Sequence, residues 1–97
     1  MTLPDIDPLR ASLEGILLVV DTPVPAIDLA RVLDVDVADV RGALAGWREE
    51  LNLRGSGIDL REVDGGWRLY TRADHADAVE AFLLDGSQSK LSRAALE

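Results

Sequence analysis

Residues 58–72, IDLREVDGGWRLYTR, contain two runs in which apolar and polar residues alternate, and the runs meet at Asp64-Gly65-Gly66. Alternation with a period of two predicts two strands. The Asp-Gly-Gly sequence supplies the positive φ angles that a tight hairpin turn needs. These strands come late in the chain and form a single hairpin, so the rest of the fold has to be built from helices.

Three segments before the hairpin have the spacing of amphipathic helices. Asp7 precedes a proline and predicts the start of a helix over residues 8–20. A second helix is expected over residues 26–33, and Asp36 with an acidic residue three positions later predicts a capped third helix over residues 37–51. The expected core residues are Leu9, Leu13, Ile16, Leu17 and Val20 in the first helix, Ile27, Leu29, Ala30 and Leu33 in the second, and Val37, Val40, Leu44, Trp47 and Leu51 in the third.

The order of elements predicts an α+β fold of the winged helix-turn-helix type, with three helices, a β-hairpin wing and a C-terminal helix. Asp74 is expected to cap that last helix, which has Val79, Phe82 and Leu83 on its inner face. We divide the chain into a flexible N-terminus (1–7), the winged-helix domain (8–85), and a linker with an unfinished amphipathic helix (86–97), which we expect to be the truncated start of a second domain.

Composition narrows the classes of function. The chain has 97 residues, which is enough for one domain with a modest core, and no cysteine. The absence of cysteine excludes disulfide frameworks, zinc ribbons and thiol nucleophiles, and favours a cytoplasmic setting. The longest apolar run, residues 16–20, is far shorter than the about 20 residues that cross a bilayer, so we expect no membrane contact.

Charge argues against a reader of DNA. The formal net charge is -8, which repels polyphosphate at long range. Neither the third helix nor the hairpin is net basic, whereas DNA readers carry a basic stripe on these elements. A weak, salt-sensitive contact through Arg61, Arg68 and Arg72 stays open, and a DNA-binding winged-helix regulator is the alternative function.

The sequence offers no catalytic or metal-binding constellation. His75 is the single histidine, and no nucleophile motif or phosphate-binding loop accompanies it. The acidic run that begins at Asp34 would need glycine where Asp39 stands and glutamate where Ala45 stands to hold calcium. We therefore expect no enzyme activity, no metal and no cofactor.

The first helix is apolar nearly all round in its second half, which points to a partner. Ala11, Gly15, Leu18 and Val19 lie off the expected core face, and we predict that they form part of a dimer interface. An isologous contact would place this helix near its symmetry mate. The other reading is that the second and last helices of the same chain cover Leu18 and Val19.

The wing is the second candidate surface for a partner. Its candidate residues are Arg61, Trp67, Arg68, Tyr70 and Arg72. Trp67 stands beside the turn and either packs in the core or anchors a partner, since tryptophan is common at interface hot spots. Tyr70 projects to the face opposite Trp67.

Four segments together resemble one bacterial family. They are PLRASLEGILLVVDTPVP (8–25), IDLARVLDVDVADVRGAL (27–44), GSGIDLREVDGGWRLYTRADHADAVEAFL (55–83) and LSRAALE (91–97). In order and spacing they resemble the N-terminal part of segregation and condensation protein B, from about Pro8 onward. One departure is the loop over residues 52–57, which lacks the longer run of charges common in relatives, so no functional contact is expected there.

The resemblance implies a function in chromosome condensation and segregation. Members of that family are described as two winged-helix domains in tandem that join a kleisin subunit, segregation and condensation protein A, to an SMC ATPase. The N-terminal domain is associated with homodimerisation, and the second domain contributes strongly to kleisin binding. The resemblance implies that the second domain, which starts within residues 86–97, is also a winged helix. The resemblance thus implies a cytoplasmic, nucleoid-associated homodimerisation and protein-interaction module with no chemistry of its own and with direct DNA binding weak or absent.

Overall fold

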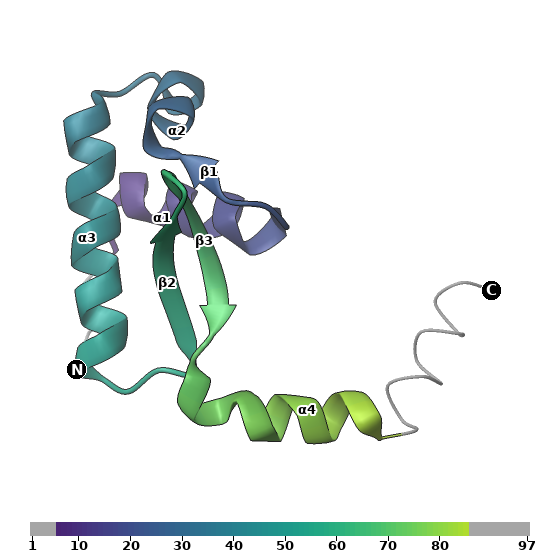
Figure 1. Cartoon of the computed structure of the whole chain (residues 1–97). Coiled ribbons are helices and arrows are strands. Elements are labelled where there is room, and N and C mark those ends of the chain that lie inside the picture. Colours follow the sequence, from purple (N-terminus) through teal and green to yellow (C-terminus); the bar gives the residue numbers. More distant parts are fainter. Residues whose placement is uncertain (1–5, 86–97) are drawn as a thin grey trace.

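The structure, a computed structural model, describes residues 6–85 of the chain. Three helices and a hairpin form the body of the domain, and a last helix follows the hairpin (Figure 1). The strands form one antiparallel sheet in the order β1-β3-β2. The winged-helix prediction is confirmed. The elements are α1 (Pro8–Val19), β1 (Val24–Pro25), α2 (Ala26–Leu33), α3 (Val37–Leu53), β2 (Ile58–Val63), β3 (Gly66–Thr71), the 3-10 turn η1 (Ala73–His75) and α4 (Ala76–Leu84).

Helix α1 begins as its sequence predicts. The Asp7 carboxylate accepts hydrogen bonds from the backbone N–H groups of Leu9 (3.1 Å) and Arg10 (3.4 Å), and Pro8 occupies the first turn. These bonds satisfy two of the donors that a helix start leaves free. Leu13 and Leu17 are buried, and Leu9, Ile16 and Val20 are partly buried against the core, which confirms the predicted stripe of this helix.

The hairpin turn follows from residues with positive φ. Asp64 (φ 53°) and Gly65 (φ 81°) form the two central positions, and the Val63–Gly66 pair closes the loop. Two successive positive φ angles define a type I′ turn, whose twist matches that of paired strands. The predicted tight hairpin is confirmed.

A third strand, which the sequence did not reveal, packs beside the hairpin. The extended connection after α1 includes β1, whose Val24 pairs with Trp67 and whose Pro25 pairs with Gly66. A Cβ at Gly66 would lie 2.7 Å from the Cβ of Pro23, so glycine is what allows this close approach. A two-residue strand has too few positions to show an alternation in the sequence.

The core lies between α1, α2, α3 and the inner face of the hairpin. Both tryptophans belong to it, with Trp47 6% and Trp67 5% exposed. The second helix differs from expectation at Ile27, which is 64% exposed. Its neighbours Ala26, Leu29 and Ala30 take the core face instead. The buried residues are Leu13, Leu17, Ala26, Leu29, Ala30, Val40, Leu44, Trp47, Leu51, Leu60 and Trp67.

Two capping predictions were wrong in detail. Asp36 occupies the N-cap position of α3, but its backbone carbonyl rather than its side chain accepts the bonds from Asp39 (3.1 Å) and Val40 (3.2 Å). Asp74 lies within the turn η1, and His75 takes the N-cap position of α4 without a side-chain bond. In both cases the backbone turn satisfies itself locally, so no carboxylate is needed.

The last helix has no inner face, which contradicts the sequence-based expectation. Val79, Phe82 and Leu83 are 39%, 53% and 55% exposed, and no residue of α4 is buried. Figure 1 shows α4 leading away from the body of the domain. The spacing correctly predicted an apolar helix, but spacing carries no information about which surface covers that helix.

Candidate protein interface

The outer face of α1 is open to solvent. Leu18 and Val19 are 77% and 79% exposed, and Ala11 and Gly15 are exposed beside them. Within residues 6–85 neither α2 nor α4 covers this face, so the reading in which the chain buries Leu18 and Val19 by itself is wrong. Large apolar side chains that are this exposed on one helix are typical of an interaction surface.

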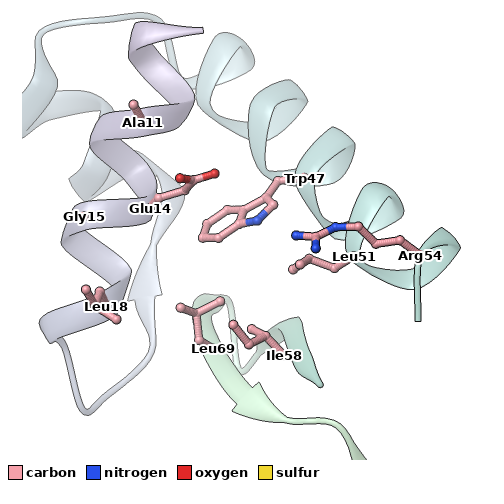
Figure 2. A pocket seen from close by; sticks show the side chains of 9 residues that line it. All are labelled: Ala11, Glu14, Gly15, Leu18, Trp47, Leu51, Arg54, Ile58 and Leu69. Atoms are coloured by element: carbon pink, nitrogen blue, oxygen red, sulfur yellow. The ribbon is translucent and has the colours of Figure 1, made fainter. Parts of the chain in front are cut away.

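Two adjoining hollows lie between this helix and the hairpin. The first has a volume of about 430 Å³ and the second about 440 Å³, and they share Leu18, Ile58 and Leu69. We call the two hollows together the α1–hairpin groove. Figure 2 shows the first hollow, where Trp47 of α3 extends toward Glu14 of α1 and Leu51 of α3 points toward Ile58 and Leu69 of the hairpin. The lining residues are Ala11, Glu14, Gly15, Leu17, Leu18, Val20, Trp47, Leu51, Arg54, Gly57, Ile58, Arg68, Leu69, Tyr70 and Thr71.

An ion-pair cluster fixes α1 against α3 next to the groove. The Arg10 guanidinium donates to Glu14 (Nε to Oε2, 3.0 Å) and through both terminal nitrogens to Glu50, with Nη2 to Oε1 at 2.9 Å. Its Cζ also lies 5.8 Å from the centre of the Trp47 ring. The hydrogen bonds from Arg10 lower the pKa of Glu50, and those same bonds raise the pKa of Arg10.

The wing residues divide into two groups. Arg61 and Arg68 are paired across the strands, and their guanidinium carbons lie 5.2 and 5.1 Å from the centre of the Tyr70 ring. These three residues form one cation–π cluster. Trp67 is separate from it, because it belongs to the buried core, which is one of the two alternatives that the sequence left open.

Arg72 holds the base of the hairpin. Its guanidinium donates to the backbone carbonyl of Ser56, to Asn52 Oδ1 (2.9 Å) and to the carbonyl of Ile58 (3.1 Å). Its backbone N–H donates to Gly57 O at 2.8 Å. The contacts of the loop over residues 52–57 are therefore internal, and they tie the end of α3 to the end of β3.

The arginines do not form a basic stripe. Arg61 Nε is 4.0 Å from Asp59 Oδ2, and Arg72 is occupied by the contacts at the base of the hairpin. On α3, the exposed residues Arg41 and Arg48 alternate with Asp39, Glu49 and Glu50. The mixed charge of both elements is unlike the basic footprint of DNA readers.

The part of the chain that the structure describes shows neither a metal-binding cluster nor a membrane-spanning helix. Over residues 6–85, no three His, Cys, Asp or Glu side chains stand close enough together to hold a metal ion. Among the helices of that range, none combines the length and hydropathy that crossing a membrane requires. Asp34 serves as the left-handed C-cap of α2 (φ 56°), with its N–H directed at Ala30 O and Arg31 O.

The sequence predicted the groove residues on α1 but not the groove residues on the hairpin. Ala11, Gly15 and Leu18 were predicted from the all-round apolar character of α1. Ile58 and Leu69 were missed as groove residues, because alternation assigns them to the core face of the hairpin together with Leu60. Leu60 is buried, while Ile58 at the start of β2 is 48% exposed. Ile58 is the first residue of the strand, and this end position is the feature of the sequence that could have predicted its exposure.

The fold and the groove together define a winged-helix domain whose open surface is apolar rather than basic. A model of the family described as "Segregation and condensation complex subunit ScpB" matches residues 11–97. The chain belongs to this family, as its sequence motifs predicted. Segregation and condensation protein B of Moorella thermoacetica is 41% identical over 91 residues, covering 94% of this chain and 46% of that protein. The chain spans about half the length of the curated relatives it matches.

Solved structures agree with the family and the fold. ScpB from Mycobacterium tuberculosis superposes with a TM-score of 0.82 at 49% identity, covering 98% of this chain and 59% of that chain. A second structure, described as a dimer of the ScpB N-terminal domain complexed with an ScpA peptide, has a TM-score of 0.72 at 24% identity. It covers 77% of this chain and 94% of the other, and at this identity it bears on the fold alone.

Proposed function

We propose that this chain is a homodimerisation and protein-interaction module of the SMC–kleisin complex that condenses and segregates the bacterial chromosome. The observation that carries the proposal is the exposed apolar face of α1 on a domain of the ScpB family. A related N-terminal domain with the same fold has been crystallised as a dimer with an ScpA peptide, which supports the same assignment. The module works in the cytoplasm, on the nucleoid.

The module has no chemistry of its own in this proposal. Arg10, Glu14 and Glu50 form ion pairs, Arg72 fixes the base of the hairpin, and His75 occupies the N-cap position of α4. ATP hydrolysis belongs to the SMC partner, and direct contact with DNA is weak or absent. The partners are a second copy of this chain, the kleisin subunit and, through the complex, the SMC ATPase.

The dimer interface includes Ala11, Gly15, Leu18 and Val19 of α1. The two small residues let another chain approach the helix closely, and Leu18 and Val19 supply the apolar area. A twofold axis would use the same face of both copies. The cation–π cluster of Arg61, Arg68 and Tyr70 is the part of the wing that we propose for partner contacts.

The domain boundaries complete the proposal. Residues 8–85 form the winged-helix domain, preceded by a short lead-in over residues 1–7. Residues 86–97 are proposed as a linker and the start of a second winged-helix domain, and they lie outside the described residues. The family match extends through residue 97, which supports continuing the family assignment into this segment.

The double substitution Leu18→Glu with Val19→Glu tests the assignment of α1. We expect a folded monomer, because two charges would have to be desolvated in the interface while both positions face water in the single chain. The readouts are mass by light scattering and helix content by circular dichroism. A dimer of unchanged affinity would remove α1 from the interface, and an unfolded chain would return these residues to the core.

A further inference from the structure

Helix α4 carries an apolar face that no other element within residues 6–85 buries. Val79, Phe82 and Leu83 have the i, i+3, i+4 spacing that places them on one side of a helix, and all three are exposed. In Figure 1 the helix extends away from α1, α3 and the sheet. An aromatic residue and two branched aliphatic residues on one exposed face need a partner surface.

The α1–hairpin groove has the shape and composition to receive such a helix. Ala11, Gly15 and Leu18 follow one another at i, i+4 and i+7 along one wall, and two of these three residues are too small to block an approaching backbone. The wall from Ala11 to Leu18 is about 10 Å long, and the nine residues of α4 span about 13 Å. The helix and the groove therefore match in length.

The direction of α4 prevents it from reaching the groove of its own chain. Arg72 fixes the end of β3 through its bonds to Asn52 and to the Ser56 and Ile58 carbonyls. The next residues close η1, where the His75 N–H donates to Arg72 O at 2.9 Å, and α4 starts at Ala76. A return of α4 onto α1 would require breaking this turn, which favours a cover from another chain.

Charge is complementary between the helix and the groove. Arg54 and Arg68 line the groove, with Glu14 as the acidic exception, while α4 carries Asp77 and Glu80. Within residues 6–85 the buried Nε of Arg68 has no hydrogen-bond partner.

We propose that the two copies of the dimer exchange α4, so that the apolar face of α4 from one copy lies in the α1–hairpin groove of the other. This inference rests on the proposed dimerisation and names the elements that meet. Reciprocal exchange is an isologous arrangement, because each copy contributes the same helix and the same groove. Phe82 is the anchor, and Arg68 pairs with the acidic side of the incoming helix.

Cysteine cross-linking between two single variants tests the exchange. The chain has no cysteine, so Gly15→Cys and Phe82→Cys each introduce one reactive thiol. A Cβ at Gly15 meets no atom within 4 Å, so the substitution fits. The two purified variants are mixed and mildly oxidised, and we expect a disulfide product of twice the chain mass whose peptides join positions 15 and 82. Val32→Cys, on the exposed side of α2, replaces Phe82→Cys in the control and should give at least tenfold less product with Gly15→Cys.

Four outcomes would overturn the inference, and they separate it from the proposed function. A double Gly15→Cys and Phe82→Cys chain that closes within itself at monomer mass would place α4 on its own groove. A product joining position 15 only to position 15 would mean that two α1 helices meet directly. A light-scattering dimer with no product joining positions 15 and 82 refutes the exchange alone, whereas a monomer at every concentration refutes dimerisation as well.

Discussion

Helices α1 and α4 are both strongly apolar, yet α1 buries apolar side chains in the core of its own domain and α4 does not. Helix α1 buries Leu13 and Leu17 in the core and is tied to α3 through Arg10. Helix α4 buries nothing and continues from a turn that leads it away from the body. The difference shows that helical periodicity predicts an apolar face in both helices but does not say whether residues of the same chain bury it.

The first way to sharpen this comparison is to remove one side chain from the buried face of α1. Leu13 is 0% exposed, so Leu13→Ala should lower the free energy of unfolding by about 2–5 kcal/mol, through lost burial and the cavity left behind. Urea titration at low protein concentration measures the loss. The matched change Leu84→Ala on α4, where the side chain is 79% exposed, should shift it by less than about 0.5 kcal/mol. Equal losses would contradict the distinction between the two helices.

The second prediction concerns the close contact between Gly66 of β3 and the segment after α1, which includes Pro23 and β1. Gly66→Ala places a Cβ 2.7 Å from Pro23 Cβ and 2.8 Å from its backbone carbon, so we expect a loss of about 1–3 kcal/mol in unfolding free energy. The control is Gly42→Ala on α3, where a Cβ meets nothing within 4 Å. That change should stabilise the domain by about 0.5–1 kcal/mol. Thermal unfolding of both variants gives the comparison, and a neutral Gly66→Ala would mean that β1 can move aside.

The third prediction addresses the open face of α4. Phe82→Ala should weaken dimerisation about tenfold, because an anchor of this size contributes most when it is fully covered by a partner. Sedimentation equilibrium measures the dissociation constant. The same substitution should leave the unfolding of the dissociated chain within about 0.5 kcal/mol of the original. Val32→Ala on α2 is the control with unchanged affinity, and unchanged affinity for Phe82→Ala would remove α4 from the interface.

The smallest effect is expected from the ion pair that fixes α1 to α3. Because Arg10 lowers the pKa of Glu50, this pair stabilises the fold above the unfolded pKa of about 4.3, and the contribution disappears as pH falls through the lowered folded pKa. Glu50→Gln should therefore unfold at slightly lower urea than the original chain at pH 7, and the difference should shrink as the pH falls below the unfolded pKa and through the lowered folded pKa of Glu50. The carboxylate is largely exposed, so the difference is small and shrinks in salt. A difference that persists at pH 3 would assign the effect to packing.

The sequence predicted the order of the elements, the hairpin turn and the stripes of α1 and α3, because periodicity and turn chemistry act locally. It failed at Ile27, at Asp74 and at the inner face of α4, where tertiary arrangement decides between equivalent local choices. For the candidate interface, the wall formed by Ala11, Gly15 and Leu18 was predictable from an excess of apolar residues. The wall formed by Ile58 and Leu69 was missed because alternation places both residues on the same face of the hairpin as the buried Leu60, and alternation does not show which residues of that face remain exposed.

Light scattering of the unmodified chain over a wide concentration range tests the central claim most directly. A module that dimerises through α1 and α4 should have twice the chain mass of 10.5 kDa at high concentration and should dissociate on dilution. The double substitution Leu18→Glu with Val19→Glu should raise the concentration below which the dimer dissociates. A mass of one chain at every concentration would contradict the account and would make binding of the chain to DNA at low salt the next measurement.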